Sequence, residues 1–409
     1  METYKFLMDL ALILLSTKVL GILSKRFNMP QVVGALLAGL LLGPAVFNIL
    51  NETEFILALS EVGVIVLMFT AGLESDISEL KKTGKSSLII AVLGVVVPLI
   101  GGFGIAYLFN KPGIIESDVS TSLLLQNIFI GVILTATSVS ITVETLKEMG
   151  KLSTSVGNAI LGAAIIDDIL GIVILTIITS TADSSVNVSV VLLKILAFFV
   201  FSGVVGFLFY KTFKKITEIY QRDMRRFVIL AFVFCLLMAY CSEVIFGVAD
   251  ITGAYIAGLI LSNSKHSKYV TTKFETLSYV LLSPIFFASI GLKVTLPKMS
   301  VAIIVFSVLL VVIAILTKIF GCGIGAKLCS FTNKESVQVG CGMVSRGEVA
   351  LIVASKGASV GLMSSMIFGP IIIVVVATTI VAPILLKFAF QSGNKSKKMN
   401  YDNENRMTA

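Results

Sequence analysis

The sequence predicts an all-α membrane protein that crosses the bilayer many times. Of its 409 residues, 56% are hydrophobic and only 14% are charged, whereas about a quarter of a soluble domain is charged. The mean hydropathy is +1.00. Apolar blocks recur along nearly the whole chain, and each is long enough to span a hydrocarbon core as a helix of roughly 20 residues. Membrane β-barrels alternate apolar and polar residues instead, so the continuous apolar runs exclude that class.

Thirteen helices are expected from these blocks and the loops between them. The first block lacks a preceding basic region and a small-residue cleavage site, so we expect a retained helix and not a signal peptide. Proline and glycine mark several helix ends, as in Asn28-Met29-Pro30 and Gly43-Pro44. The expected helices, numbered one to thirteen, cover residues 4–23, 31–49, 55–73, 87–109, 122–146, 155–180, 188–210, 226–246, 249–262, 271–292, 300–328, 335–360 and 364–389.

Lysine and arginine predict how these helices are oriented, because cytoplasmic loops of membrane proteins are enriched in both. Nearly all loop lysines and arginines follow odd-numbered helices or lie in the C-terminal tail. The other side holds only Lys5, Lys111, Lys293 and Lys298. The N-terminus is therefore expected outside and the C-terminus in the cytoplasm, in a cell membrane. One missed or invented span would scramble this asymmetry, so it also supports the helix count.

Thirteen helices divide into two units of six joined by one linker helix, which places the second unit upside down relative to the first. Many secondary transporters are built from such inverted repeats. The fifth helix of each unit has a polar interruption, at 135–140 in helix 5 and at 342–348 in helix 12. Interruptions at corresponding positions point to a binding site near the bilayer midplane, although small and hydroxylated residues also let helices pack closely.

Charged residues inside the predicted spans need a partner or a function, because a central charge costs about 2.5–3.5 kcal/mol on insertion scales. Asp167 and Asp168 fall near the middle of helix 6, and Lys318 lies on helix 11 among closely spaced glycines. Neighbours on a helix project about 100° apart, so the two carboxylates are expected to have different partners. Lys318 is a natural partner for one of them, while the other is expected to face a cavity. A static salt bridge would explain one aspartate but not both.

These groups are suited to exchange of an alkali cation for a proton. A hard cation such as Na⁺ needs oxygen ligands, which carboxylates, hydroxyls and the free carbonyls of a broken helix supply. Burial disfavours the charged form of a carboxylate. Such a group can therefore bind either a proton or a cation near neutral pH, but not both well. That competition is antiport in its simplest form.

Other functional classes find little support. His266, the only histidine, falls in a loop and is interpreted as solvated, so a metal site lacks ligands. No nucleophile–base pair or cofactor motif indicates an enzyme, and no cofactor is expected beyond the transported ions. The net charge of +8 reflects membrane topology and not nucleic-acid binding. The cysteines are expected to pack as small hydrophobes; they are Cys235, Cys241, Cys322, Cys329 and Cys341.

Six stretches carry a family pattern, in this order: VGALLAGLLLGP (33–44), TATSVSIT (135–142), AAIIDDILGIVIL (163–175), SPIFFASIGL (283–292), TKIFGCGIGA (317–326) and SRGEVALIVASKG (345–357). With them the sequence resembles the monovalent cation/proton antiporter superfamily. Within it, the chain is similar to the electrogenic bacterial and archaeal Na⁺/H⁺ antiporters with an Asp-Asp signature. The expected topology also agrees with the thirteen-helix NapA-type members.

The resemblance implies roles for individual residues. Asp168 would be the essential carrier of proton and Na⁺. Asp167 would pair with Lys318, an arrangement associated with electrogenic exchange. Further ion-binding and supporting positions would lie where helices 5 and 12 cross, with Arg346 and Glu348 offsetting half-helix dipoles or bracing the core. The ion-binding candidates there are Thr137 and Ser138, and the supporting candidates are Thr135, Arg346 and Glu348.

The resemblance also implies an elevator-like mechanism, in which a core domain carries the ion past a dimer domain, and a homodimer in the lipid bilayer. The homodimer would form through helices 1–3 and 8–10. The implied divisions are dimer-domain residues 1–86 and 212–299, core residues 87–181 and 300–389, linker residues 182–211, and a tail at 390–409. The tail is polar and charged and is expected to be too short to fold on its own.

Several alternatives stay open. Stretches similar to SRGEVALI and SPIFFASIGL also occur in glutathione-gated potassium efflux systems, so a K⁺/H⁺ antiporter without its usual regulatory domain is the nearest alternative. Those systems tend to vary the first acidic position, here Asp167. A sodium-coupled symporter would need recognition groups for an organic substrate, which the sequence does not reveal. An ion channel would conduct without obligatory counter-transport. Selectivity between Na⁺ and K⁺, stoichiometry, and proton transfer by Lys318 also stay open.

Overall fold

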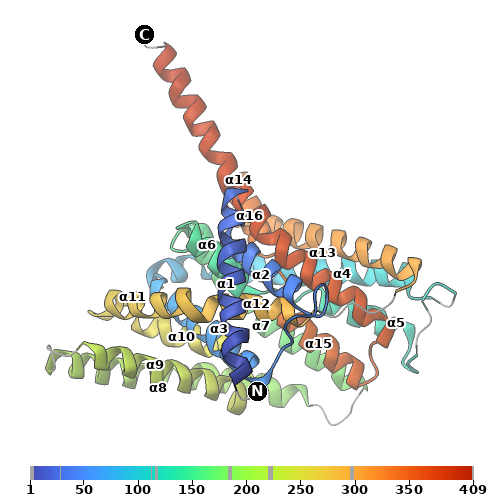
Figure 1. Cartoon of the computed structure of the whole chain (residues 1–409), viewed down its shortest axis with the longest axis horizontal. Coiled ribbons are helices and arrows are strands. Elements are labelled where there is room, and N and C mark those ends of the chain that lie inside the picture. The colour runs from blue at the N-terminus through green and yellow to red at the C-terminus, as the bar shows by residue number, and fades with distance from the viewer. Residues whose placement is uncertain are drawn as a thin grey trace.

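The computed structural model is helical across the residues that it describes, which are 4–27, 29–111, 113–115, 118–182, 187–219, 224–294 and 299–407. Within these ranges no strand occurs, and nine helices are long and apolar enough to cross a membrane. The chain is therefore a multi-pass helical membrane protein (Figure 1). The α-helices are α1 (Lys5–Arg26), α2 (Gln31–Leu42), α3 (Glu54–Glu74), α4 (Ile77–Phe109), α5 (Leu123–Ile133), α6 (Val139–Glu148), α7 (Ser155–Ala182), α8 (Val188–Ile219), α9 (Arg225–Tyr240), α10 (Asp250–Ser262), α11 (Ser267–Leu277), α12 (Ser283–Leu292), α13 (Val301–Leu328), α14 (Asn333–Gly342), α15 (Glu348–Ser359) and α16 (Ser365–Met407).

Short π-helical turns join some of these helices into longer rods. The turn Cys241–Phe246 continues α9, and the turn Ser278–Leu282 connects α11 to α12. The resulting rods, Arg225–Phe246 and Ser267–Leu292, are each long enough to cross a hydrocarbon core.

Several helices continue beyond their apolar blocks, where the sequence prediction was wrong about their ends. α4 begins at Ile77 instead of 87, because Asp76 caps a polar first turn by accepting a hydrogen bond from the Ser78 amide. The expected domain boundary at residue 86 therefore falls inside a helix. α8 continues to Ile219, and α16 continues through the expected tail to Met407, extending away from the other helices (Figure 1). Hydropathy marks only the apolar part of a helix.

α2 is shorter than predicted, because it ends at Leu42 and not at 49. Gly43 follows with an extended backbone, and it precedes Pro44. The proline ring disfavours the helical conformation in the residue before it. The Gly-Pro pair therefore stops the helix even though the residues beyond it remain apolar.

Both expected polar interruptions are breaks in the helical backbone. One lies between α5 and α6, and the other lies between α14 and α15. The two breaks contact each other: the Ser138 amide donates to the Ser345 carbonyl at 2.7 Å, and the Ser345 hydroxyl donates to the Ser138 carbonyl at 2.7 Å. Thr142 adds a hydrogen bond from its hydroxyl to the Gly342 carbonyl, also at 2.7 Å. The two broken helices cross at their interruptions.

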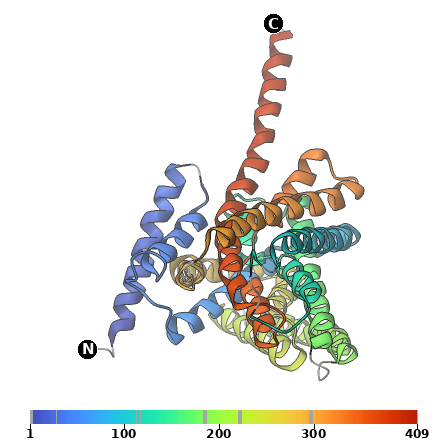
Figure 2. The same ribbon diagram turned by 90° about the vertical axis from the view of Figure 1, so that its right-hand side faces the viewer.

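α4 contacts both α7 and α13, which carry the buried charges. A Cβ added at Gly321 of α13 would lie 2.6 Å from the Leu93 carbonyl oxygen of α4, and one added at Gly325 would lie 2.9 Å from the Ile90 Cα. Only glycine permits so close an approach. Figure 2 shows α1 and α2, in dark blue, at one edge of the molecule and α4, in teal blue, at the opposite edge.

Candidate functional site

The buried ion pair between Asp167 and Lys318 joins α7 to α13. Lys318 Nζ donates to Asp167 Oδ1 at 3.0 Å and to Oδ2 at 3.2 Å. The Asp167 side chain is 1% exposed and the Lys318 side chain is 0% exposed. Removing two charges from water is costly, and close contact with both carboxylate oxygens offsets that cost. Removal of one partner would leave an uncompensated buried charge, which typically costs about 3–5 kcal/mol.

Asp168 differs from its neighbour in its surroundings. Its side chain is half-buried, and no described residue gives its carboxylate a hydrogen bond or an ion pair. The charges that act on it most strongly are those of Asp167 and Lys318. Since adjacent helical side chains project about 100° apart, Lys318 binds one carboxylate and leaves the other with its acceptor capacity unused.

Thr137 lies in the first break and is 1% exposed. Its side chain lies close to the Asp167 carboxylate, and within the described part of the chain its hydroxyl makes no hydrogen bond of ordinary geometry. Buried polar atoms are nearly always paired. The break therefore holds a hydroxyl beside Asp167 whose hydrogen-bonding capacity is not fully used.

Arg346 lies at the crossing and is almost completely buried, at 1% exposure. Its guanidinium donates to the Leu134 carbonyl from Nη2 at 2.8 Å and from Nε at 3.3 Å. It also donates to the carbonyls of Val344 and Ala314, at 2.8 and 2.9 Å. Leu134 is the C-cap of α5, and Val344 follows the end of α14. Arg346 therefore places a positive charge at the negative ends of both half-helix dipoles.

This geometry can be set beside known proteins. Residues 11–392 match the transmembrane sodium/hydrogen exchanger family. The chain belongs to this family. The resemblance expected from the six sequence stretches is thereby confirmed, and the family is one of transporters.

The chain is similar to two relatives in sequence and to one solved structure in fold. The Na(+)/H(+)-K(+) antiporter GerN of Bacillus cereus is 39% identical over 401 residues, which cover 97% of this chain and 99% of GerN. A Na(+)/H(+) antiporter of Enterococcus hirae is 37% identical, with 94% of this chain and 98% of the relative covered. The sodium proton antiporter MjNhaP1 of Methanocaldococcus jannaschii has the same fold, with a TM-score of 0.69 at 20% identity, and the match covers 96% of this chain and 98% of MjNhaP1.

The other residues predicted for the site have no recorded contact with Asp167 or Asp168 in the described part of the structure. The Thr135 hydroxyl, just beyond the end of α5, donates to the Val132 carbonyl of that helix at 2.7 Å, so it is already used locally. The Ser138 hydroxyl lies 3.3 Å from the Ser140 hydroxyl, while the Ser138 backbone joins the two breaks. The backbone of Glu348 begins α15, and its side chain lies outside the described part of the structure.

Sequence reasoning missed groups that position the exchanger's charges. A Cβ added at Gly94 of α4 would meet Cys322 Sγ at 2.6 Å, Lys318 Nζ at 3.8 Å and Asp167 Oδ1 at 3.9 Å, so Gly94 makes room for the ion pair. Two α16 threonines hold the Arg346 backbone: Thr378 accepts from its amide at 3.3 Å, and Thr379 donates to its carbonyl at 2.5 Å. A glycine inside a long apolar helix is the only sequence signal for Gly94. A Thr-Thr pair in an apolar span is the only signal for the threonines.

Proposed function

We propose that the chain is an electrogenic antiporter that exchanges Na⁺ or Li⁺ for H⁺, with Asp168 as the carrier. The observation that carries this proposal is the contrast between two adjacent carboxylates. Asp167 is held by Lys318 at 3.0 Å, whereas Asp168 is half-buried and has no partner among the described residues. Both relatives are named as Na⁺/H⁺ antiporters, which supports the same choice of ions.

In the proposed cycle, Asp168 binds either a proton or a cation, because one partly desolvated carboxylate cannot hold both well. The Thr137 hydroxyl and carbonyls of the broken helices complete an oxygen-rich site for Na⁺. Arg346 stays bound to carbonyls at the ends of α5 and α14, so these carbonyls keep their position as the ion enters and leaves. Asp167 and Lys318 hold α7 against α13 and supply the charged pair that the family resemblance associates with electrogenic exchange.

The proposed architecture has thirteen spans, if α5–α6, α9 with its π turn, α11–α12 and α14–α15 each count as one crossing. Two inverted six-helix repeats would then flank α8 as the linker. In an elevator-like motion, a core of α4–α7 and α13–α16 moves past a dimer domain of α1–α3 and α9–α12. The N-terminus lies outside and the C-terminus in the cytoplasm, as the lysine and arginine distribution favours. A homodimer forms through the dimer domain.

Proteoliposomes containing a pH-sensitive dye test the exchange directly. Addition of Na⁺ or Li⁺ is expected to move protons in the opposite direction, and Asp168→Ala is expected to abolish this response. Glu218→Gln is the matched control, since this carboxylate is exposed at the C-terminal end of α8. Robust exchange by the Asp168→Ala protein would overturn the assignment of the carrier.

Electrogenic exchange is tested by an imposed membrane potential. A potassium gradient with valinomycin is expected to drive Na⁺ uptake or release according to the sign of the potential. If the rate is the same at every potential, exchange is electroneutral, and the role proposed for the Asp167–Lys318 pair is wrong.

K⁺/H⁺ exchange is a second candidate, favoured by the name of the relative GerN, which includes K⁺ beside Na⁺. Carboxylate, hydroxyl and carbonyl oxygens serve either ion, and cavity geometry decides between them. Rates measured with Na⁺, Li⁺ and K⁺ across a pH series separate the two functions. Saturable exchange with K⁺ alone would replace the sodium proposal.

A further inference from the structure

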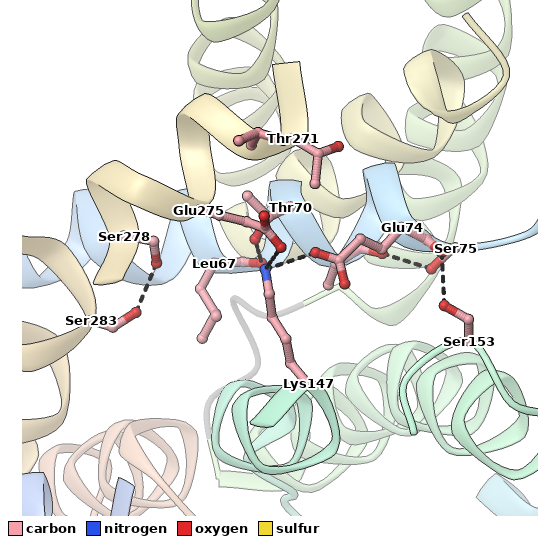
Figure 3. Close-up of polar contacts among 12 residues, drawn as sticks. Leu67, Thr70, Glu74, Ser75, Lys147, Ser153, Thr271, Glu275, Ser278 and Ser283 are labelled. Atoms are coloured by element: carbon pink, nitrogen blue, oxygen red, sulfur yellow. Dashed lines mark hydrogen bonds and ion pairs between the residues drawn. The ribbon is translucent and has the colours of Figure 1, made fainter. Parts of the chain in front are cut away.

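The last turn of α6 carries two adjacent charges of opposite sign, Lys147 and Glu148. Lys147 Nζ lies 2.7 Å from Glu74 Oε1 on α3 and 3.4 Å from Glu275 Oε1 on α11. Figure 3 shows the ammonium between the two carboxylates. Glu148 Oε2 accepts a hydrogen bond from the Gln31 backbone amide at 2.7 Å. A single helical turn therefore contacts three other helices.

Each of these contacts joins a charge to a complementary group. Gln31 is the first residue of α2, and the first amides of a helix lack intrahelical partners and form its positive end. The Glu148 carboxylate thus caps α2 from another helix. Lys147 separates two carboxylates that would repel each other without it. The Lys147 and Glu74 side chains are only 20% and 22% exposed, so water screens this pair less than a pair on the open surface.

The contacts gather where the chain passes from the proposed dimer domain into the proposed core. Glu74 is the last residue of α3, and only Ser75 and Asp76 separate it from α4. The Ser153 hydroxyl, in the α6–α7 loop, donates to the Glu74 carbonyl at 3.3 Å. A cavity of about 340 Å³ adjoins the cluster and is lined by Lys147, Glu148 and Glu275 together with Gln31, Glu144, Ser278, Tyr279 and Ser283.

We infer that Lys147 and Glu148 form an interdomain latch: they hold α6 of the core against α2, α3 and α11 of the dimer domain, and their contacts break each time the core moves. Lys147 is the central positioning residue, because it binds two dimer-domain carboxylates, Glu74 and Glu275. The inference rests on the proposed function for its place in a transport cycle. The contacts themselves predict a conformational equilibrium that can be measured without transport.

Spin labels placed on the two domains measure that equilibrium. Suitable positions are Lys151, in the α6–α7 loop, and Lys268, near the start of α11, which are both exposed. Each is changed to cysteine in a background where the half-buried Cys241 and Cys329 are replaced by serine; the other three cysteines are buried. Distances between the labels are recorded by double electron–electron resonance in nanodiscs without Na⁺.

Lys147→Met is expected to lower the population of the main wild-type distance about fivefold relative to all other distances. The reason is that this variant loses a partly exposed ion-pair network. Glu74→Gln and Glu275→Gln should each shift it less. The exchanged pair Lys147→Glu with Glu74→Lys, made together with Glu275→Gln so that no carboxylate faces the changed position 147, should return it towards wild type. Lys85→Met is the matched control, because the structure records no ion pair for this exposed α4 lysine.

Unchanged distances in Lys147→Met, Glu74→Gln and Glu275→Gln would overturn the latch. So would a shift that the exchanged pair fails to reverse. If Lys147→Met does not elute as a homogeneous species, the test rests on Glu74→Gln and Glu275→Gln, which keep the side-chain volume. If the distances shift as expected while the wild type shows no cation/proton exchange, the latch stands and the proposed function fails.

Discussion

Gly94→Ala tests how tightly α4 packs over the buried ion pair. The added Cβ would lie 2.6 Å from Cys322 Sγ, about 1 Å closer than ordinary van der Waals contact. Cys322 is fully buried, so moving its sulfur to another rotamer must displace packed neighbours. Overpacking of this kind costs about 1–3 kcal/mol, while the gain in helix propensity from glycine to alanine returns up to about 1 kcal/mol. A net loss of about 0.5–2 kcal/mol is expected.

Cys322→Ala removes the sulfur and with it the clash, so the double variant should be more stable than the sum of the single effects predicts. The expected coupling is about 1–2 kcal/mol. Unfolding in mixed micelles by sodium dodecyl sulfate, followed by circular dichroism, measures all four proteins; the chain has no tryptophan for fluorescence. Exchange activity should recover in parallel, because the new Cβ is in ordinary contact with Lys318 Nζ, at 3.8 Å. Additive effects of the two substitutions would refute this reasoning.

Three further predictions follow from the crossing and from one loop. Arg346→Met should lower the unfolding free energy by about 3 kcal/mol or more, because three buried carbonyls lose this donor, at about 1–3 kcal/mol each; wild-type stability in the same micelle titration would contradict this. Thr137→Val should leave stability within about 1 kcal/mol of wild type and raise the KM for Na⁺ severalfold in proteoliposomes; an unchanged KM would remove Thr137 from the ion site. Hydrogen bonds from Ser365 and Ser364 hold the pKa of Asp118 below its usual value. Its stabilising effect is therefore present at neutral pH and is lost as the pH falls through the lowered pKa. In Asp118→Asn, this loss of stability at low pH should be absent. The difference in unfolding free energy should be less than about 1 kcal/mol, since the Asp118 carboxylate is largely exposed. Identical melting profiles of the variant and the wild type across the acid range would count against the prediction.

The sequence predicts the elements of this fold well, because the transfer of apolar and charged groups into lipid dominates their placement. The two helix breaks were predictable for a related reason. Their runs of polar and small residues, around Ser138 and Ser345, are hard to place in an uninterrupted apolar helix. Helix ends were less predictable where capping decides them: Asp76 begins α4 ten residues before its expected start at 87.

The candidate site also has a part that the sequence predicts and a part that it does not. An aspartate partner for Lys318 could be predicted from the sequence, since few buried charges of opposite sign were available, and the family resemblance assigned that role to Asp167. The partners of Arg346 could not, because it binds backbone carbonyls, and every residue carries one. The role of Gly94 could not be predicted from the sequence for a related reason. Its effect depends on which side chains approach it from α7 and α13, and no local pattern records that.

The short connection between α3 and α4 restricts the path along which the proposed core can travel. Ser75 and Asp76 alone join the two helices, and so short a segment reaches about 10 Å when fully extended. A body held by so short a connection at one membrane face moves least at that face. The displacement of the proposed core is then expected to be small near residues 75 and 76 and to grow with distance from them.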